Sequence, residues 1–245
     1  MDVNSSNAPP QGDYPGSENK RLGEVAHELG RLLRSSAPVD WQRSRRWCSD
    51  VLRPLIESSQ TSRRLTEMLD GKNFIVGGDE HHVINVASDP GRIYKLTHGD
   101  NFGCRPFFSP HDPDLTGKHF HGTGNADPFF YLTRWRLLNR LSGYKTRFEG
   151  LLLPEHPQWL PRMCISQPKV GGENPDIEEI RAAMERYGFI RISENAYLHI
   201  ETRVLLTDMA PRNVRIIGGV PVPFDAIATF AAPEIMIWAS RQVGP

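Results

Sequence analysis

The sequence predicts an α+β fold, and two observations support this prediction. Apolar residues with helical three-four spacing are separated by shorter, strand-like runs that end at Gly, Pro, Asp or Asn. The chain has 245 residues, of which 38% are hydrophobic. This length suffices for one two-lobed domain or for two small ones, and this composition can form a core.

The first 72 residues are predicted to precede the two lobes. Residues 1–20 are rich in Asn, Ser, Gly and Pro, which predicts a disordered tail. Residues 21–72 predict a helical N-terminal extension, with Asp40 as one helix N-cap. This extension has an arginine-rich face, which fits either a solvated surface or a surface that binds a partner: Arg43, Arg45, Arg46 and Arg53.

Residues 73–166 predict a small lobe. Its expected elements are strands at 74–76, 83–86 and 92–97, an insertion loop at 98–126, a helix between Asp127 and Gly143, and strands at 148–153 and 162–166. Pro128 favours the first turn of the helix and Gly143 its end. Gln167 and Pro168 are expected to break the sheet and to begin a connector.

Residues 167–245 predict a reduced large lobe. Its expected elements are a helix between Asp176 and Gly188, strands at 189–192, 197–200, 204–206, 214–217 and 220–224, and a last helix at 233–241. No internal repeat or coiled coil interrupts this order.

Three polar residues near the ends of the last strands form the most informative pattern. Asp208 follows one apolar strand, Asn213 follows Pro211 in the next turn, and Asp225 ends a second apolar run. Asp and Asn are common in turns, but a carboxylate that ends an apolar run is costly to bury without a partner. Their spacing is that with which kinases hold metal-bound ATP. It predicts that Asp208 orients an acceptor hydroxyl, and that Asn213 and Asp225 hold Mg²⁺, which prefers oxygen ligands.

A second group of residues, of the types that bind nucleotide phosphates, lies earlier in the sequence. Gly77 and Gly78 occupy the turn after the first strand, where backbone amides can approach phosphates because no side chain intervenes. Lys95 lies in the middle of the third strand. Two glycines in a hairpin can be purely structural, and a strand lysine can simply be exposed. The spacing between them, however, is what a phosphate-anchoring lysine needs.

The span from about residue 74 to 228 resembles the kinase-like domain found in polyvalent proteins of mobile elements and in bacterial hypothetical proteins. The matching segments are 77–83, 92–97, 131–139, 165–168, 178–189 and 208–225. This resemblance implies a two-lobed, protein-kinase-like fold with a truncated C-terminal lobe and with ATP between the lobes.

The resemblance also implies individual roles. Lys95 would hold the α- and β-phosphates, and Ser166 and Gln167 would belong to the hinge over the adenine. Asp208 would be the catalytic base, with the Mg²⁺ ligands assigned as above. The implied function is ATP- and Mg²⁺-dependent phosphoryl transfer. The alternatives are a catalytically silent nucleotide-binding or protein-interaction module, and a toxin or defence component of a mobile element.

Several features depart from typical kinases. Asp208 lacks the preceding His-Arg, and Asp225 lacks the following Phe-Gly. The helix after Lys95 places Thr133 or Arg134 near the height where a carboxylate partner is expected, so that partner is unassigned. Because only 20 residues follow Asp225, we expect no peptide groove of the usual kind. The alternatives are then a small-molecule acceptor, a protein that docks elsewhere, or no acceptor at all.

Composition limits the classes of partner. Lys+Arg and Asp+Glu both number 29, so bulk charge gives no reason to expect binding to nucleic acid or to a membrane. The three cysteines are widely spaced and favour a reducing cytoplasm. We expect a soluble, cytoplasmic protein, since neither a signal peptide nor a membrane-spanning run is evident. The His and Cys residues of the 98–126 insertion are zinc-ligand types, but their spacing matches no compact zinc finger.

Overall fold

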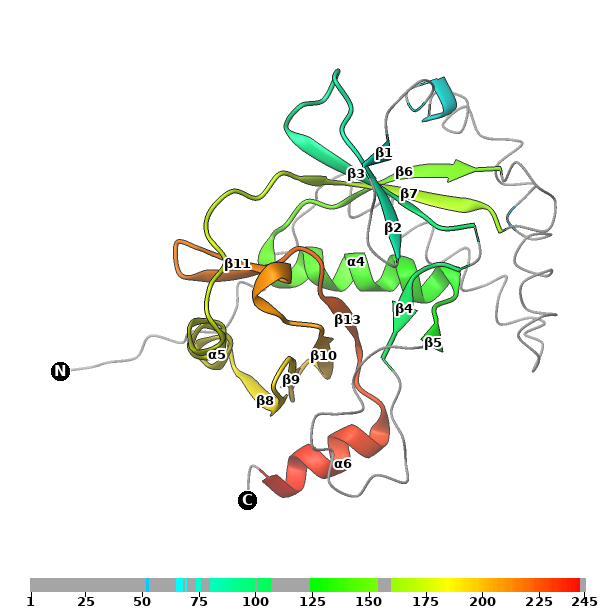
Figure 1. The fold of residues 1–245 in the computed structure, drawn as a ribbon. Coiled ribbons are helices and arrows are strands. Elements are labelled where there is room, and N and C mark those ends of the chain that lie inside the picture. Colours follow the sequence, from blue (N-terminus) through cyan, green and yellow to red (C-terminus); the bar gives the residue numbers. More distant parts are fainter. Residues whose placement is uncertain are drawn as a thin grey trace.

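The computed structural model describes residues 52, 65–67, 69, 74–75, 80–99, 101–106, 124–153 and 160–242 (Figure 1). In these ranges the fold is α+β, with antiparallel sheets. The predicted tail, nearly all of the helical extension with its arginine-rich face, and the Gly77-Gly78 turn lie outside the described residues. None of the described helices is both long and apolar enough to cross a bilayer.

The first sheet has five strands. Their spatial order is β1 (Phe74–Ile75), β2 (His81–Ile84), β3 (Arg92–Thr97), β7 (Arg162–Pro168) and β6 (Arg147–Leu152). Lys95 on β3 lies opposite Val83 on β2 and Ile165 on β7. The sheet therefore supports Lys95 from both sides.

Two predictions about this sheet are wrong. β2 begins at His81, so His81 and His82 belong to the strand and not to the turn. Gln167 and Pro168 extend β7, and Pro168 lies opposite Arg92. Proline is tolerated there because the pairing of β6 with β7 ends at Ser166, so β7 is an edge on that side at Pro168. The sheet thus runs two residues past the predicted lobe boundary at residue 166.

The helix α4 (Pro128–Ser142) confirms the predicted boundaries. The Asp127 side chain accepts a hydrogen bond from the Phe130 N–H, and Gly143 ends the helix with φ 65°, a left-handed conformation that favours glycine. Within the predicted insertion loop, β4 (Cys104–Arg105) pairs with β5 (Gly124–Asn125). In Figure 1, α4 lies beneath the five-stranded sheet.

The second sheet has four strands, in the order β13 (Ile227–Phe230), β10 (Val204–Thr207), β9 (Ala196–His199) and β8 (Phe189–Ser193). The prediction omitted β13, whose short run is stabilised by pairing with β10. The remaining elements are α5 (Ile177–Arg186), capped by Asp176 as predicted, the hairpin of β11 (Val214–Ile217) and β12 (Val220–Pro223), and α6 (Pro233–Gln242).

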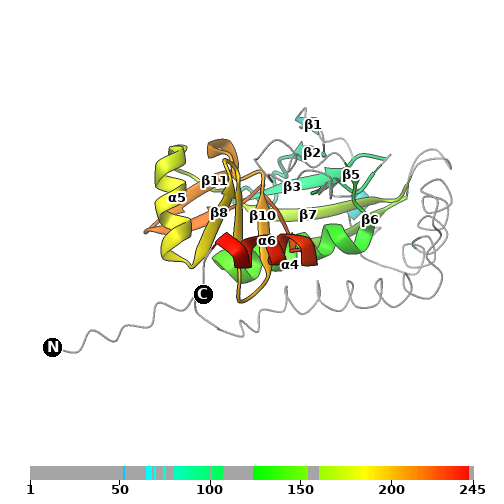
Figure 2. The ribbon, with the colours of Figure 1, turned by 90° about the horizontal axis from the view of Figure 1, so that it is seen from below.

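One apolar core joins both sheets through α4. It includes Trp135 of α4, Ile165 of β7 and Leu206 of β10. α4 also contacts β12 and β13, and in Figure 1 the second sheet lies on the side of α4 away from the first. Seen from below, α6 covers strands of the second sheet (Figure 2), where it buries Ile235 and Ala239. The segment that joins β12 to β13 lies between α4 and β3, because Asp225 contacts Arg134 of α4 and Lys95 of β3.

Candidate functional site

Lys95 and Asp225 meet where β3 faces the segment after β12. Lys95 is 6% exposed, and its Nζ atom lies 2.6 Å from Asp225 Oδ1. The Asp225 side chain is 38% exposed, so the carboxylate borders solvent while the amine is covered. The structure thus brings together two residues that the sequence pattern had placed in one site.

Asp208 and Asn213 lie in the loop between β10 and β11. Asn213 is the last residue of the 3-10 turn Pro211–Asn213, and Asp208 precedes this turn. The Asn213 side chain donates a 2.9 Å hydrogen bond to the Asp208 carbonyl. The Asn213 carbonyl accepts hydrogen bonds from the N–H groups of Phe224 and Asp225, at 3.0 and 3.3 Å. Asn213 therefore ties the Asp208 loop directly to Asp225.

Arg134 of α4 is the most connected side chain of the site, and it is 1% exposed. Its Nε donates to the Ala226 carbonyl and its Nη2 to the Asp225 carbonyl, each at 2.9 Å. Its Nη1 lies 2.7 Å from Glu80 Oε2. The guanidinium also packs 4.6 Å from the centre of the Trp135 ring.

Sequence reasoning left Arg134 without a role and missed Glu80. The available signal for Arg134 was a charged residue at an apolar-stripe position, three residues after Tyr131 and four before Leu138. For Glu80 no local signal existed. Its Oε1 accepts a 2.8 Å hydrogen bond from the Cys104 N–H, and this contact joins segments that the sequence does not relate.

Glu80, His81 and Asp225 each place one potential metal-ligand atom within 4.8 Å of the others. The His81 ring is buried, and its Nε2 atom forms one 2.9 Å hydrogen bond with the Tyr131 hydroxyl. Lys95 and Arg134 stand beside the two carboxylates, so two positive charges already compensate two negative ones. This trio is therefore a poor cation site in the arrangement present.

These surroundings shift the pKa values of Asp225, which is partly buried, and of His81, which is buried. Burial alone would raise the pKa of Asp225, but Lys95 and Arg134 outweigh it and lower that pKa to about 2. Burial, assisted by the charge of Lys95, lowers the pKa of His81 to about 3. At neutral pH the site therefore holds an ionised Asp225 and a neutral His81.

Asp208 is shifted in the opposite direction. Burial raises the pKa of its carboxyl, with a further contribution from the charge of Asp225, while Arg212 acts against both. The Arg212 Nη2 atom lies 3.4 Å from Asp208 Oδ1 on the exposed side of the loop. A carboxylate with a raised pKa is a better proton acceptor than an ordinary aspartate.

Ser166 and Gln167 are both buried, and their side chains are engaged within the protein. The Ser166 hydroxyl donates to Glu149 and accepts a 2.8 Å hydrogen bond from Arg92 Nε. The Gln167 side chain donates a 3.0 Å hydrogen bond to the Phe224 carbonyl. Gln167 thus joins β7 to the residue before Asp225, and the Ser166 carbonyl also accepts a 2.8 Å hydrogen bond from Arg92 Nη2.

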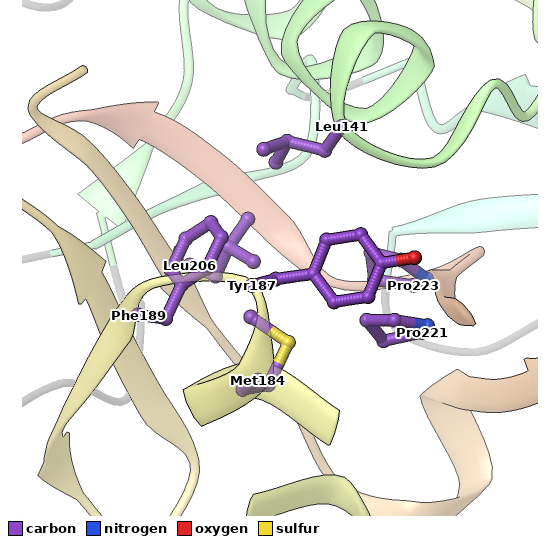
Figure 3. Close-up of a pocket in the computed structure, with 7 residues that line it drawn as sticks. All are labelled: Leu141, Met184, Tyr187, Phe189, Leu206, Pro221 and Pro223. Atoms are coloured by element: carbon purple, nitrogen blue, oxygen red, sulfur yellow. The ribbon is translucent and has the colours of Figure 1, made fainter. Parts of the chain in front are cut away.

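An apolar pocket lies where α4, the end of α5, β8, β10 and β12 meet (Figure 3). Its lining residues are Leu141, Met184, Tyr187, Phe189, Leu206, Pro221 and Pro223. The Tyr187 hydroxyl is the only side-chain polar group among them. None of the charged residues described above lines this pocket, so it is separate from the candidate site.

The site thus unites groups from β3, α4, the β10–β11 loop and the segment after β12. Comparisons with family models, with curated proteins and with solved structures each found no match for this chain. Its chemistry is therefore inferred from the side chains themselves.

Proposed function

We propose that this protein is an ATP- and Mg²⁺-dependent phosphotransferase with a protein-kinase-like arrangement of its two sheets. One observation carries the proposal. The Lys95 amine from the first sheet meets the Asp225 carboxylate after β12, and Asn213 ties Asp225 to the Asp208 loop. Four residues whose types suit phosphoryl transfer thus occupy one place.

The order of the elements supports this proposal. A lysine on the third strand of an antiparallel sheet is followed by a helix packed beneath the sheet, and β7 then leads out to the second half. There β10 leads to Asp208 and Asn213, the β11–β12 hairpin follows, and Asp225 leads into β13, which pairs back with β10. This is the order that the kinase-like resemblance implies.

Each residue has a chemical task in the proposed reaction. Lys95 would contact the phosphates, and Asp208 would accept the proton of the acceptor hydroxyl. The acceptor oxygen forms its bond to the γ-phosphorus as the bond to the β–γ bridging oxygen breaks, so that ADP leaves. Asn213 and Asp225 offer oxygen donors, which fit Mg²⁺. The metal would supply neutralisation of the phosphate charge.

A catalytically silent nucleotide-binding module is the second candidate, and one observation favours it. The Asp225 carboxylate is already 2.6 Å from Lys95 and 3.7 Å from Arg134. A metal ion at Asp225 must compete with both cations. If that competition fails, the fold can still bind a nucleotide through Lys95 without turnover.

α6, which follows β13, packs on the second sheet through Ile235 and Ala239. This face of α6 is therefore not available to bind a peptide. We propose a small molecule, or a protein that docks elsewhere, as the acceptor.

Thermal unfolding with ATP alone and with ATP plus Mg²⁺, together with ADP release, tests the proposal. We expect Mg²⁺ and ATP to raise the unfolding temperature of the wild type and of Asp208→Asn, but not of Lys95→Met. ADP release should be lost in Asp208→Asn. Lys169→Met, at an exposed lysine just after β7, is the matched control and should behave as wild type. Absence of any nucleotide response would refute both candidates, and binding without turnover would favour the silent module.

A further inference from the structure

The kinase-like resemblance places a carboxylate partner for Lys95 near Thr133 or Arg134 of α4. In this chain Lys95 is paired instead with Asp225, at 2.6 Å. A carboxylate at position 134 would face the carbonyl oxygens of Asp225 and Ala226 and the carboxylate of Glu80, which are the three acceptors that Arg134 now satisfies. The cation at this position therefore follows from its surroundings.

Arg134 uses three of its five N–H donors within the protein. Each of its three nitrogens has an acceptor at 2.7 to 2.9 Å: two main-chain carbonyls and Glu80. Its side chain is 1% exposed and stacks on Trp135. Two further N–H donors remain on Nη1 and Nη2, but a phosphate group cannot reach them while the side chain is covered, so in this site phosphate binding is left to Lys95.

The acceptors of Arg134 come from separate parts of the chain. Asp225 and Ala226 form the start of the segment that leads into β13, while Glu80 lies two residues after Gly78 and is fixed by the Cys104 N–H. A planar guanidinium can reach three such acceptors at once, whereas a lysine ammonium presents a single point of charge. Arg134 thus connects α4, the Asp225 segment and the end of the predicted glycine turn.

We propose that Arg134 is a positioning residue, which holds the Asp225 main chain and Glu80 in the places that metal-nucleotide binding requires. The proposal rests on the proposed function for its metal and nucleotide. Moving α4 away from Asp225 would leave buried carbonyls and a carboxylate without their donor, which is costly. The Asp225 carboxylate is therefore presented from a fixed backbone, and the metal has to displace Lys95 and compete with the more distant charge of Arg134.

Hydrogen exchange of the full chain without nucleotide tests whether Arg134 holds the Asp225 main chain in place. In Arg134→Lys we expect the amides of residues 224–228 to exchange about tenfold faster or more, because a hydrogen bond to a charged group is lost there. The matched control is Arg140→Lys, at an exposed position on the same helix, and it should leave these amides unchanged. Equal exchange in Arg134→Lys and wild type would overturn the proposal.

A Mg²⁺ titration at constant ATP tests the positioning role. The Mg²⁺ concentration for half-maximal thermal stabilisation should rise about 10- to 100-fold in Arg134→Lys, the usual effect of removing an orienting partner. A merely structural role would lower the unfolding temperature without moving this midpoint, and an unmoved midpoint would overturn the proposal.

Glu80→Gln provides a second variant should Arg134→Lys fail to fold. It keeps an amide oxygen as an acceptor but removes the charge. We expect faster amide exchange of residues 224–228 and a higher Mg²⁺ midpoint, both smaller than in Arg134→Lys. If wild type shows no response to Mg²⁺ and ATP, the proposed function fails. Amide hydrogen exchange of residues 224–228 still decides whether Arg134 holds this segment in place. If wild type responds and neither variant differs from it, the proposed function stands and the role of Arg134 is refuted.

Discussion

Lys95 Nζ and Asp225 Oδ1 lie 2.6 Å apart although the two residues are 130 positions apart in the sequence. This contact joins β3 of the first sheet to the segment between β12 and β13. Arg134 reinforces the same junction from α4, since it donates to the Asp225 carbonyl at 2.9 Å. Stability and the proposed chemistry therefore depend on the same charged groups, and variants at this junction should affect both.

Replacing Lys95 by Met should destabilise the fold by about 1 to 3 kcal/mol. It leaves the Asp225 carboxylate without its nearest cation, but that side chain is partly exposed and keeps Arg134 nearby, so the loss should fall below that of a fully buried pair. Urea unfolding measures the change. Lys95→Met combined with Asp225→Asn should cost less than the sum of the single changes, and simple additivity would show that the two groups do not interact.

The stability of the protein should fall in acid as Asp225 is protonated. The pKa of this carboxyl is lowered from 3.8 to about 2 by Lys95 and Arg134, which outweigh burial. Because the unfolded chain binds the proton more readily, the stabilisation is complete above about pH 4 and is lost as the pH falls through 2. Urea unfolding in a chelating buffer should show a shallower decline in Asp225→Asn over this window. Identical slopes would contradict the assignment.

His81 should cause a separate loss of stability at milder pH. Burial, with the nearby charge of Lys95, lowers its pKa from 6.5 to about 3. The folded state keeps the ring neutral while the unfolded chain takes up a proton, so stability is complete above about pH 6.5 and declines as the pH falls toward 3. His81→Gln, which can retain a hydrogen bond to Tyr131, should reduce the decline between about pH 6.5 and 4.5. An unchanged slope would mean that His81 titrates normally.

The backbone at Asp208 should make substitutions there unequal. Its φ is 55°, in the left-handed region, where Asn is tolerated and Ala costs about 1 kcal/mol or more. Asp208→Asn should therefore unfold at nearly the wild-type temperature, and Asp208→Ala at a clearly lower one. Equal unfolding temperatures would show that this conformation carries no strain. If Ala is destabilised, Asp208→Asn is the variant with which to test loss of turnover.

The pH dependence of ADP release should report the state of Asp208. Burial raises the pKa of its carboxyl above the usual 3.8, and Arg212 opposes that shift. If the ionised form accepts the proton, the rate falls as the pH drops through the raised pKa. Arg212→Gln should move that midpoint to higher pH, and added salt should produce part of the same effect because Arg212 is exposed. A midpoint unchanged in Arg212→Gln would show that this cation does not tune Asp208.

Local signals in the sequence were enough to predict several elements. Asp127 and Gly143 marked the ends of α4, and Asp176 marked the start of α5, because capping depends on residues within one turn of the helix. Pro168 was misassigned, since only the pairing of Arg92 with it shows that β7 continues. The omission of β13 has the same cause, because a four-residue strand is defined by its neighbour β10.

By itself the sequence determined the α+β class, the caps of the main helices and the grouping of Asp208, Asn213 and Asp225, because each of these depends on residue types at short spacing. Only the tertiary structure decided which cation meets which carboxylate. Arg134 and Glu80 are 54 positions apart, and their pairing depends on how α4 packs between two sheets. A buried charge must find its partner in space, and sequence spacing does not specify that partner.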